Sequence, residues 1–443
     1  MLRDGHRLFG TDGVRGVANT SLTPEFALGL GRAAGELLDI GPVVVGRDTR
    51  RSGEMLSSAM QAGFHAVGID TVDVGVLPSP AIAHATAHSA AMMGVVISAS
   101  HNPAPDNGIK LLGGDGYKLT DAAEDRIESR LRRGQPWRNP VGPQVGTRFV
   151  SQEAGEAYVQ SIVNAAQHSF RGIDFVLDTA NGAAFKTAPE VFRRLKASIE
   201  VIAADPDGTN INEGVGATHP EALARVANGR VGFSFDGDAD RLIAIDEDGL
   251  PANGDVVMAI IARHLKERDE LKNNLVVTTV MANLGFHKAM QALNINVETA
   301  AVGDRYVLES MKKLGADFGG EQSGHMIFLD TSTTGDGTLS AVKLADVMAS
   351  TGKQLRELRK EVITEFPQVL RNVRVGDASG LADAELLWAA VADVERELGD
   401  DGRVLVRASG TEPVIRVMVE AAEKSVALAK TDELVGVVRN AFA

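Results

Sequence analysis

The sequence has no cysteine among its 443 residues. Disulfide bonds, thiolate nucleophiles and cysteine-ligated metals are therefore excluded, and a reducing cytoplasm is the natural compartment. Long hydrophobic runs are lacking too, since no stretch approaches the roughly 20 apolar residues that cross a bilayer. The first residues, Met1–Arg7, contain no apolar core of a secretory signal. We therefore expect a cytoplasmic protein without a membrane partner.

Positive charge is in short supply as well. The chain carries 45 lysines and arginines against 59 aspartates and glutamates, which gives a formal net charge of −14. A surface that binds nucleic acid needs an excess of positive charge, so we expect no nucleic-acid partner. An acidic protein can still bind a phosphorylated metabolite, provided that it builds a local basic pocket. The composition leaves the oligomeric state open, and a homodimer is one alternative.

The chain is long enough for several domains. Hydrophobic residues make up 44% of it, which is enough for sizeable cores, and its length suggests about three domains. Strand-like and helix-like segments alternate almost throughout, a pattern typical of repeated α/β modules with mostly parallel sheets. The polar stretch 132–145 contains three prolines and indicates a domain edge. From about residue 367 the pattern changes, which predicts a smaller α+β domain.

The most informative loop follows the apolar run Met93–Ile97, which is short and branched enough to be a buried strand. The loop itself is Ser98–Pro103, and the turn formers of 104–108 and a second strand, Ile109–Leu112, come after it. It is therefore held stiffly at the end of a strand, where α/β proteins often place their chemistry. Ser100 at its centre needs a base, a metal or a phosphoryl group to react. A solvated turn of serine and asparagine is the alternative.

Three carboxylates on alternate residues, Asp236, Asp238 and Asp240, lie between two strand-like segments. A hard divalent cation relieves their mutual repulsion, and Mg²⁺ or Ca²⁺ prefers such oxygen ligands. A calcium loop of the EF-hand type is an alternative, but Arg241 occupies the position that needs glycine, and strands rather than helices flank the loop. Two further alternatives are an aspartyl phosphatase, with Asp236 as its nucleophile, and a solvated acidic turn.

Two later loops carry groups suited to a phosphorylated sugar. Gly319–His325 combines glycines, which let a ligand approach the backbone, with Glu, Ser and His side chains that can bind sugar hydroxyls. Arg407–Pro413 follows a strand and, together with Arg416, offers guanidinium groups, hydroxyls and backbone N–H groups that suit a phosphate dianion. For this second loop the alternative is an ordinary Ser/Thr turn.

These four loops, in this order, resemble those of the α-D-phosphohexomutase family. The opening Phe9–Gly16 is also similar, and Gln322 resembles the branch of the family that acts on glucosamine phosphates. The resemblance covers essentially the whole chain and implies four domains around one cleft. The expected fold class is α/β, with three similar α/β domains that have mixed sheets and a smaller α+β C-terminal domain around a central cleft. The expected domain boundaries are 1–154, 155–252, 253–366 and 367–443.

The resemblance also implies a role for each matching residue. Ser100 is implied to be a phosphoserine. The implied ligands of Mg²⁺ are that phosphate, Asp236, Asp238 and Asp240. The residues implied in catalysis are Ser100, Lys110, Arg15 and His325. The residues expected to bind the substrate and its phosphates are Arg241, Glu321, Ser323, Arg407, Ser409, Gly410, Thr411 and Arg416. Gly303–Arg305 is a further candidate for a sugar contact.

The implied chemistry is a double phosphoryl transfer, which depends on positioning and charge neutralisation more than on new covalent chemistry. Phosphoserine gives its phosphoryl group to a sugar hydroxyl, and the bisphosphate turns over and returns the other one. Glucosamine 1,6-bisphosphate, or a similar hexose bisphosphate, is the implied intermediate and activator. The implied substrates are the phosphorylated amino sugars glucosamine 6-phosphate and glucosamine 1-phosphate, used in amino-sugar nucleotide and cell-wall precursor synthesis. The alternatives are a mutase for glucose or mannose phosphates, a non-catalytic sugar-phosphate binder and a metal-dependent phosphatase.

Overall fold

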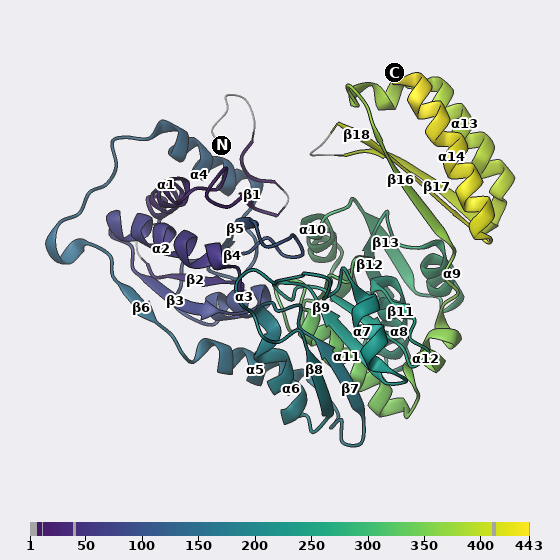
Figure 1. Cartoon of the computed structure of the whole chain (residues 1–443), viewed down its shortest axis with the longest axis horizontal. Helices are drawn as coiled ribbons and strands as arrows, with labels where there is room; N and C mark the ends of the chain where they lie inside the picture. The colour runs from purple at the N-terminus through teal and green to yellow at the C-terminus, as the bar shows by residue number, and fades with distance from the viewer. Residues whose placement is uncertain (1–6, 11, 39–40, 410–412, 443) are drawn as a thin grey trace. The chain divides into compact units, whose positions relative to one another are not determined.

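The structure is a computed structural model that describes residues 7–10, 12–38, 41–409 and 413–442. The chain forms two compact units. The first unit comprises residues 1–280 and 295–361, and the second comprises residues 281–294 and 362–443. The first unit contains three sheets, and we call each sheet with its helices the first, second and third module (Figure 1).

The first module is built on a six-stranded sheet with the strand order β1-β5-β4-β2-β3-β6. Its strands are β1 (Val14–Val17), β2 (Val43–Arg47), β3 (Thr71–Val76), β4 (Met93–Ile97), β5 (Asp106–Gly113) and β6 (Arg148–Val150). Strand β5 pairs antiparallel with β1 and β4, whereas the other pairs are parallel. The helices are α1 (Pro24–Gly35), α2 (Arg51–Ala66), α3 (Ser79–Ala87), α4 (Asp121–Arg133) and the 3-10 helix η1 (Gly142–Gln144).

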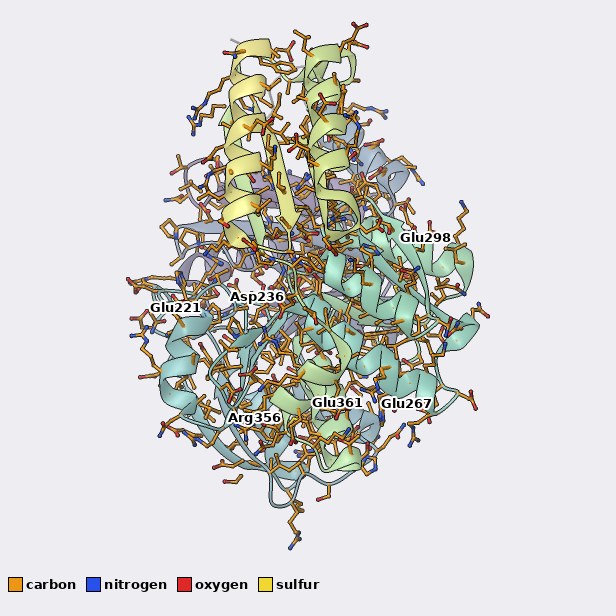
Figure 2. All side chains as sticks on the ribbon, turned by 90° about the vertical axis from the view of Figure 1, so that its right-hand side faces the viewer. Glu221, Asp236, Glu267, Glu298, Arg356 and Glu361 are labelled. Atoms are coloured by element: carbon orange, nitrogen blue, oxygen red, sulfur yellow. The ribbon has the colours of Figure 1, made fainter. Side chains whose placement is uncertain are left out.

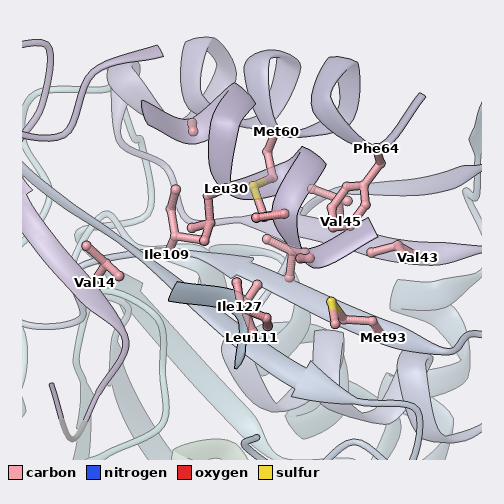
Figure 3. Packing of buried hydrophobic residues seen from close by; sticks show 14 of the residues in the cluster. Val14, Leu30, Val43, Val45, Met60, Phe64, Met93, Ile109, Leu111 and Ile127 are labelled. Carbon is pink, nitrogen blue, oxygen red and sulfur yellow. The ribbon is translucent and has the colours of Figure 1, made fainter. Parts of the chain in front are cut away.

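One face of this sheet carries the main core of the first module. Figure 3 shows Leu30 of α1 with Met60 and Phe64 of α2, near Val43 and Val45 of β2. Alternate residues of a strand point to the same side, so these two valines share a face. All five side chains are fully buried, and burial of such a side chain contributes about 1.5–3 kcal/mol. This core fixes β2 and β4, whose carboxyl ends carry functional loops.

The second module has a five-stranded sheet with the order β11-β10-β9-β7-β8. Its strands are β7 (Asp174–Asp178), β8 (Ser198–Ile202), β9 (Val231–Phe235), β10 (Leu242–Ile245) and β11 (Pro251–Ala252). The pairs of β7 with β8 and β9 are parallel, whereas β10 pairs antiparallel with β9 and β11. The helices are α5 (Ala154–Ala165), the 3-10 helix η2 (Ala183–Phe185), α6 (Thr187–Arg194) and α7 (Pro220–Ala227).

The third module has a four-stranded sheet with the order β13-β12-β14-β15. Its strands are β12 (Leu275–Thr279), β13 (Asn296–Ala300), β14 (Phe318–Gly320) and β15 (Met326–Phe328). The first two pairs are parallel, and β15 returns antiparallel to β14. The helices are α8 (Gly254–Glu267), the 3-10 helix η3 (Lys272–Asn274), α10 (Asp304–Leu314), α11 (Gly337–Thr351) and α12 (Leu355–Val362).

The second unit is a three-stranded antiparallel sheet with helices. Its strands, in sheet order, are β16 (Gln368–Arg374), β18 (Val414–Ala421) and β17 (Gly402–Ala408). The helices are α9 (Leu284–Ala292), the 3-10 helix η4 (Ser379–Asp383), α13 (Glu385–Leu398), the 3-10 helix η5 (Gly399–Asp401) and α14 (Lys424–Ala441). Helix α9 thus belongs to this unit although it precedes the rest of the unit by many residues.

The buried carboxylate of Glu420 links α9 to this sheet. It accepts hydrogen bonds from Asn283 Nδ2 at 3.2 Å and from the Leu284 N–H at 2.9 Å. From the sheet it accepts hydrogen bonds from Gln368 Nε2 and Arg403 Nε, both at 2.8 Å. Glu420 is 0% exposed, and a buried charge is tolerated only with such partners. Glu420 therefore joins two sequence segments into one body.

The expected fold class is confirmed by three α/β modules with mixed sheets and a smaller α+β C-terminal part. One local expectation was wrong, because the turn predicted over 104–108 is shorter and β5 already begins at Asp106. The reason is that β1 pairs with this stretch, Arg15 lying opposite Gly108. In the described part of the chain, no helix is long and apolar enough to cross a membrane.

Candidate active site

Ser100 lies in the loop after β4, with its backbone in the left-handed region at φ 52°. A residue other than glycine keeps this conformation only where its surroundings impose it. Here the Ser100 N–H donates to Ser98 Oγ at 2.9 Å, and the Ser100 hydroxyl donates to Asp236 Oδ2 at 2.6 Å. Ser100 is buried. The strained loop therefore directs its hydroxyl at a carboxylate of the second module.

Arg50, which precedes α2, holds this loop by its backbone. Its guanidinium donates to the carbonyl oxygens of Ser100 at 2.9 Å and Asn102 at 2.7 Å, to that of Pro103 in the same loop, and to that of Asp106 at the start of β5. Arg50 Nε also donates to Asp48 at 2.8 Å, and Asp48 accepts the hydroxyl of Ser98 at 2.7 Å. Both side chains of the pair are fully buried. Burial raises the pKa of Asp48, although Arg50 opposes this shift.

The carboxylates of Asp236, Asp238 and Asp240 converge in the loop between β9 and β10, with one oxygen of each within 4.8 Å of the others. All three residues are buried, and Figure 2 shows Asp236 inside the ribbon while Glu221 and Glu267 lie at its outside. The loop joins strands, whereas an EF-hand calcium loop joins helices.

Two oxygens of this triad are left over. Within the described part of the chain, Asp238 Oδ1 and Asp240 Oδ1 are buried and accept no hydrogen bond, although Arg241 Nε lies 3.8 Å from Asp240 Oδ1. Buried carboxylate oxygens without partners are costly, so the triad fits a hard divalent cation that binds oxygen. Burial and the charges of Asp240 and Asp238 raise the pKa of Asp236. Burial also opposes the charge on Asp240, but Lys110 and His325 outweigh it and lower its pKa.

Ser79, the first residue of α3, contacts the triad from the first module. Its hydroxyl donates to Asp238 Oδ2 at 2.6 Å, and its N–H donates to the carbonyl oxygen of Asp238 at 2.9 Å. Lys110 Nζ lies 3.2 Å from the same Oδ2. This oxygen is therefore occupied, and Oδ1 is the oxygen of Asp238 that remains for a cation.

Lys110 on β5 places an ammonium group among three carboxylates. Its Nζ lies 3.2 Å from Asp12, 3.2 Å from Asp238 and 3.7 Å from Asp240. Burial disfavours the charge on Lys110, but these carboxylates outweigh burial and raise its pKa. Lys110 is thus charged at neutral pH, and it is better suited to neutralise a phosphoryl group than to accept a proton.

Two guanidinium groups lie beside the Ser100 loop. Arg241 Nη1 faces His101 Nδ1 at 3.2 Å, and Arg15 is paired with Asp12. The Nε atoms of both arginines are buried and have no hydrogen-bond partner among the described residues. Burial, Arg241 and Arg15 lower the pKa of His101 to about 4, so its ring is neutral at pH 7. Such unused donors suit an anionic group.

The predicted sugar loop connects β14 and β15. Glu321 Oε1 accepts the Gly303 N–H at 3.2 Å, so two of the predicted sugar segments lie against each other. Ser323 is exposed. The side chain of Gln322 donates to Asp255 Oδ2 at 3.0 Å. Gln322, the residue that resembles the glucosamine branch, therefore ties this loop to α8, which carries Asp255.

His325 lies between two carboxylates of the first unit. Its Nε2 accepts the Gly335 N–H at 3.2 Å, which places the ring proton on Nδ1, 3.7 Å from Asp240 Oδ2. Its Nε2 is also 3.8 Å from Asp304. Burial alone lowers the pKa of His325, but Asp240 and Asp304 outweigh burial and raise it.

The sequence reasoning missed Asp12 and Lys118, as it missed Asp48 and Arg50. Lys118 Nζ lies 2.6 Å from Asp12 and also pairs with Asp304. Asp12 stands within Phe9–Gly16, a stretch singled out only as a whole, and this was the available signal. Nothing in the sequence marks Lys118, because its place depends on a turn after β5. The neighbouring Arg305 pairs with α4 of the first module.

In the second unit, Arg407 of β17 and Arg416 of β18 are direct partners in the antiparallel ladder. Burial and the charge of Arg416 lower the pKa of Arg407. Arg416 Nε is buried without a hydrogen-bond partner among the described residues, so the pair suits an anion. Ser409 follows β17, whereas Gly410 and Thr411 lie outside the described residues.

Four family models match the chain in sequence order. They are the phosphoglucomutase/phosphomannomutase α/β/α domains I, II and III and the C-terminal domain, matching residues 6–136, 156–249, 253–366 and 370–435. The chain belongs to the phosphoglucomutase/phosphomannomutase family, the phosphohexomutases.

Relatives and solved structures match over nearly the whole length. The phosphoglucosamine mutase of Halalkalibacterium halodurans is 48% identical over 440 residues, covering 98% of each chain. That of Bacillus subtilis is 47% identical over 442 residues, again with 98% of each chain. A phosphoglucomutase/phosphomannomutase family protein from Burkholderia thailandensis has a TM-score of 0.83 at 24% identity, covering 98% of this chain and 97% of that one. The N-acetylphosphoglucosamine mutase of Aspergillus fumigatus, in complex with GlcNAc-6P and magnesium, has a TM-score of 0.71 at 17% identity, covering 98% and 96%. Both solved structures share the fold of the present chain.

Proposed function

We propose that the chain interconverts glucosamine 6-phosphate and glucosamine 1-phosphate, the reaction of a phosphoglucosamine mutase. Relatives of that name, 48% identical over 98% of the chain, support the substrate. The observation that carries the chemistry is the Ser100 hydroxyl, 2.6 Å from Asp236 in a buried triad with two unpartnered oxygens. The alternative, a solvated turn of serine and asparagine, does not account for a hydroxyl that is held against a buried acidic cluster.

Ser100 exchanges one phosphoryl group with the sugar in each half of the proposed reaction. The bond between phosphorus and Ser100 Oγ breaks and a bond from phosphorus to a sugar hydroxyl oxygen forms, while the sugar hydroxyl gives up its proton and Ser100 Oγ takes one up, so no proton is released overall. The bisphosphate, glucosamine 1,6-bisphosphate, then turns over and the same steps run in reverse from its other phosphoryl group. Lys110 and Arg15 neutralise charge on the moving group. His325 is the remaining candidate for proton transfer.

The residues proposed to hold Mg²⁺ are Asp236, Asp238 and Asp240, together with the Ser100 phosphate. The two unpartnered carboxylate oxygens of the triad support this assignment. When bound, Mg²⁺ neutralises charge on the phosphoryl oxygens and helps to orient them. Since Asp236 already accepts the Ser100 hydroxyl, a role for Asp236 as the nucleophile of a phosphatase is less well supported.

The substrate contacts are likewise proposals. The residues proposed to bind the sugar and the transferred phosphoryl group are Glu321, Ser323 and Arg241. The residues proposed to bind the other phosphate are Arg407, Ser409, Gly410, Thr411 and Arg416. The Nε atom of Arg416 has no hydrogen bond among the described residues, which supports an anion near it; Arg241 Nε also has no hydrogen bond but lies 3.8 Å from Asp240 Oδ1.

Four domains with the boundaries 1–154, 155–252, 253–366 and 367–443 are part of the proposal. The family matches end and restart close to these positions, as at 249 and 253 or at 366 and 370, which supports them. A cytoplasmic location, the lack of a nucleic-acid partner and a homodimer stay predictions.

A coupled assay on glucosamine 6-phosphate, glucose 6-phosphate and mannose 6-phosphate tests the substrate. We expect glucosamine 6-phosphate to be preferred, and a preference for the neutral sugars would favour the other mutases of the family. Release of inorganic phosphate alone would indicate a phosphatase.

Peptide mapping tests the phosphoserine. We expect phosphate on Ser100 in freshly purified protein, and we expect Ser100→Ala to lose several orders of magnitude in kcat. The matched control is Ser89→Ala, an exposed serine of the same module, which should keep the activity. Full activity in Ser100→Ala would refute the mechanism.

A further inference from the structure

The segment 113–118 forms a turn that extends β5 beyond its pairing with β4. The Gly113 N–H donates to the Tyr117 carbonyl at 2.8 Å, and Lys118 bridges back to Leu112. We call this segment the tongue. Because β5 also carries Lys110, the tongue and this catalytic candidate share one rigid hairpin.

The tongue contacts the third module at three points. The Gly116 carbonyl accepts the hydroxyl of Thr333 at 3.1 Å. Lys312 Nζ lies 3.1 Å from the centre of the Tyr117 ring, which is a cation–π contact. Lys118 pairs with Asp304, the first residue of α10. Of these three contacts, the one made by Lys118 also involves the candidate site, because Lys118 pairs with Asp12.

Unlike the exposed lysines of the chain, Lys118 is largely buried and lies between two carboxylates. Its side chain is only 13% exposed, and its Nζ lies between Asp12 of the first module and Asp304 of the third. Asp12 in turn holds Lys110 and Arg15. Lys118 therefore reaches the catalytic candidates of the first module through one carboxylate and His325 through the other.

Six side chains lie in a closed ring in which carboxylates alternate with nitrogen-bearing groups; five of the contacts join a carboxylate to an N–H group, whereas His325 Nε2, which accepts the Gly335 N–H, only lies next to Asp304. In order around the ring the side chains are Asp12, Lys110, Asp240, His325, Asp304 and Lys118. All three modules of the first unit contribute, and only Asp240 comes from the second module. The separations are 3.2 Å for Asp12 to Lys110, 3.7 Å for Lys110 to Asp240, 3.7 Å for Asp240 to His325 and 3.8 Å for His325 to Asp304.

We propose that Lys118 is a positioning residue that closes this ring and so fixes Lys110 and His325 on either side of Asp240. The inference rests on the proposed function. Its physical basis is that two carboxylates, Asp12 and Asp304, share one ammonium group. Without that group they repel each other in a poorly solvated place, and the third module moves away from the tongue. Lys110 and His325 then no longer keep their positions relative to each other.

The test compares Lys118→Met with Lys118→Arg in the full-length protein. We expect Lys118→Met to lower kcat by about 10- to 100-fold, the size of a misplacement of roughly 1 Å. The KM for glucosamine 6-phosphate should change less than kcat, because Lys118 itself is not among the residues proposed to bind the sugar or its phosphates. Lys118→Arg should recover part of kcat, since a guanidinium can pair with two carboxylates.

The matched control is Lys312→Met, which removes the other cation between the tongue and the third module but has no link to Asp12 or Asp304. It should keep kcat. If both methionine variants lower kcat equally, docking of the tongue matters and the ring does not. If Lys118→Met raises KM and leaves kcat unchanged, Lys118 is a substrate contact and the inference is overturned.

Amide hydrogen exchange separates this inference from the proposed function. In Lys118→Met, exchange should become faster in the tongue and at the start of α10, and in Lys312→Met the start of α10 should exchange as in the wild type. Unchanged exchange in Lys118→Met overturns the inference whatever the substrate is. If the wild type fails to convert glucosamine 6-phosphate while the two variants show this exchange pattern, the proposed function is refuted and the ring is supported.

Discussion

Replacing Arg50 by methionine should lower the thermal stability of the first module and disorder the Ser100 loop. Methionine keeps most of the apolar stem but removes the guanidinium. The change breaks the buried pair with Asp48, at 2.8 Å, and the hydrogen bonds to the carbonyls of Ser100 and Asn102, at 2.9 and 2.7 Å. It leaves the Asp48 carboxylate buried without its cation.

The size of the effect follows from the burial of this pair. Removing one partner of a buried ion pair costs about 3–5 kcal/mol. For a domain of roughly 150 residues, each kcal/mol shifts Tm by about 2–4 °C, so we expect a loss of roughly 6–20 °C. The neighbouring Arg51 is exposed, and Arg51→Met is the matched control that should shift Tm by no more than about 2 °C.

Tryptophan fluorescence can report this module alone. The chain has two tryptophans, of which Trp137 packs against Arg130 in the first module and Trp388 lies on α13 of the second unit. In a Trp388→Phe background, the melting curve followed by fluorescence therefore belongs to the first module. Adding Asp48→Asn to Arg50→Met should recover part of the loss, because no unpaired charge stays buried. Equal melting of Arg50→Met and Arg51→Met would refute the reasoning.

Three further predictions concern other residues. Asp336 caps α11 by accepting the Leu339 N–H at 2.9 Å. Burial raises the pKa of Asp336 to about 6, above its value in the unfolded chain, so stability is lost as the pH rises from about 4 to 6; Asp336→Asn, which keeps this cap, should flatten this part of a urea-unfolding series, and an unchanged slope contradicts it. Ser79→Ala should weaken Mn²⁺ binding, measured by electron paramagnetic resonance, by about tenfold because Asp238 loses its orienting donor; equal affinity in both proteins argues against this. Arg407→Ala should raise the KM of glucosamine 6-phosphate and glucosamine 1-phosphate alike, by about 10- to 100-fold; an effect on one substrate only would contradict the proposal that Arg407 binds the non-reacting phosphate of both.

The Ser100 loop and the acidic triad were predictable because their signals are local. A strand, a serine loop and a turn follow one another within a few residues, and Asp236, Asp238 and Asp240 alternate on one loop. Ser79 was not predictable in the same way. It reaches Asp238 across 159 residues of sequence, and a serine at the start of a helix looks the same whether it caps the helix or orients a metal ligand.

The fold shows the same division between local and distant information. Alternating strands and helices predicted the α/β modules, and the short loops before β5, β10 and β15 leave no room for a crossover, so antiparallel returns follow from the sequence as well. The order of the strands in each sheet, such as the pairing of β1 with β5, could not be placed in this way. The role of Lys118 could not be predicted for the same reason, since its partner Asp304 lies 186 residues further along the chain. Gln322 shows the opposite problem, because a residue typical of a branch need not face the ligand, and here it donates to Asp255.

The carboxylate of Glu420 has a consequence for the study of the C-terminal part by itself. A gene fragment that begins at Pro367 encodes β16, β17 and β18 but omits Asn283 and Leu284, which donate two of the hydrogen bonds to this buried group. During synthesis on the ribosome, α9 likewise leaves the exit tunnel long before the strand that carries Glu420 has been made. The isolated fragment should therefore need the 281–294 segment, supplied as a peptide or joined through a new linker, before it folds as it does in the whole protein.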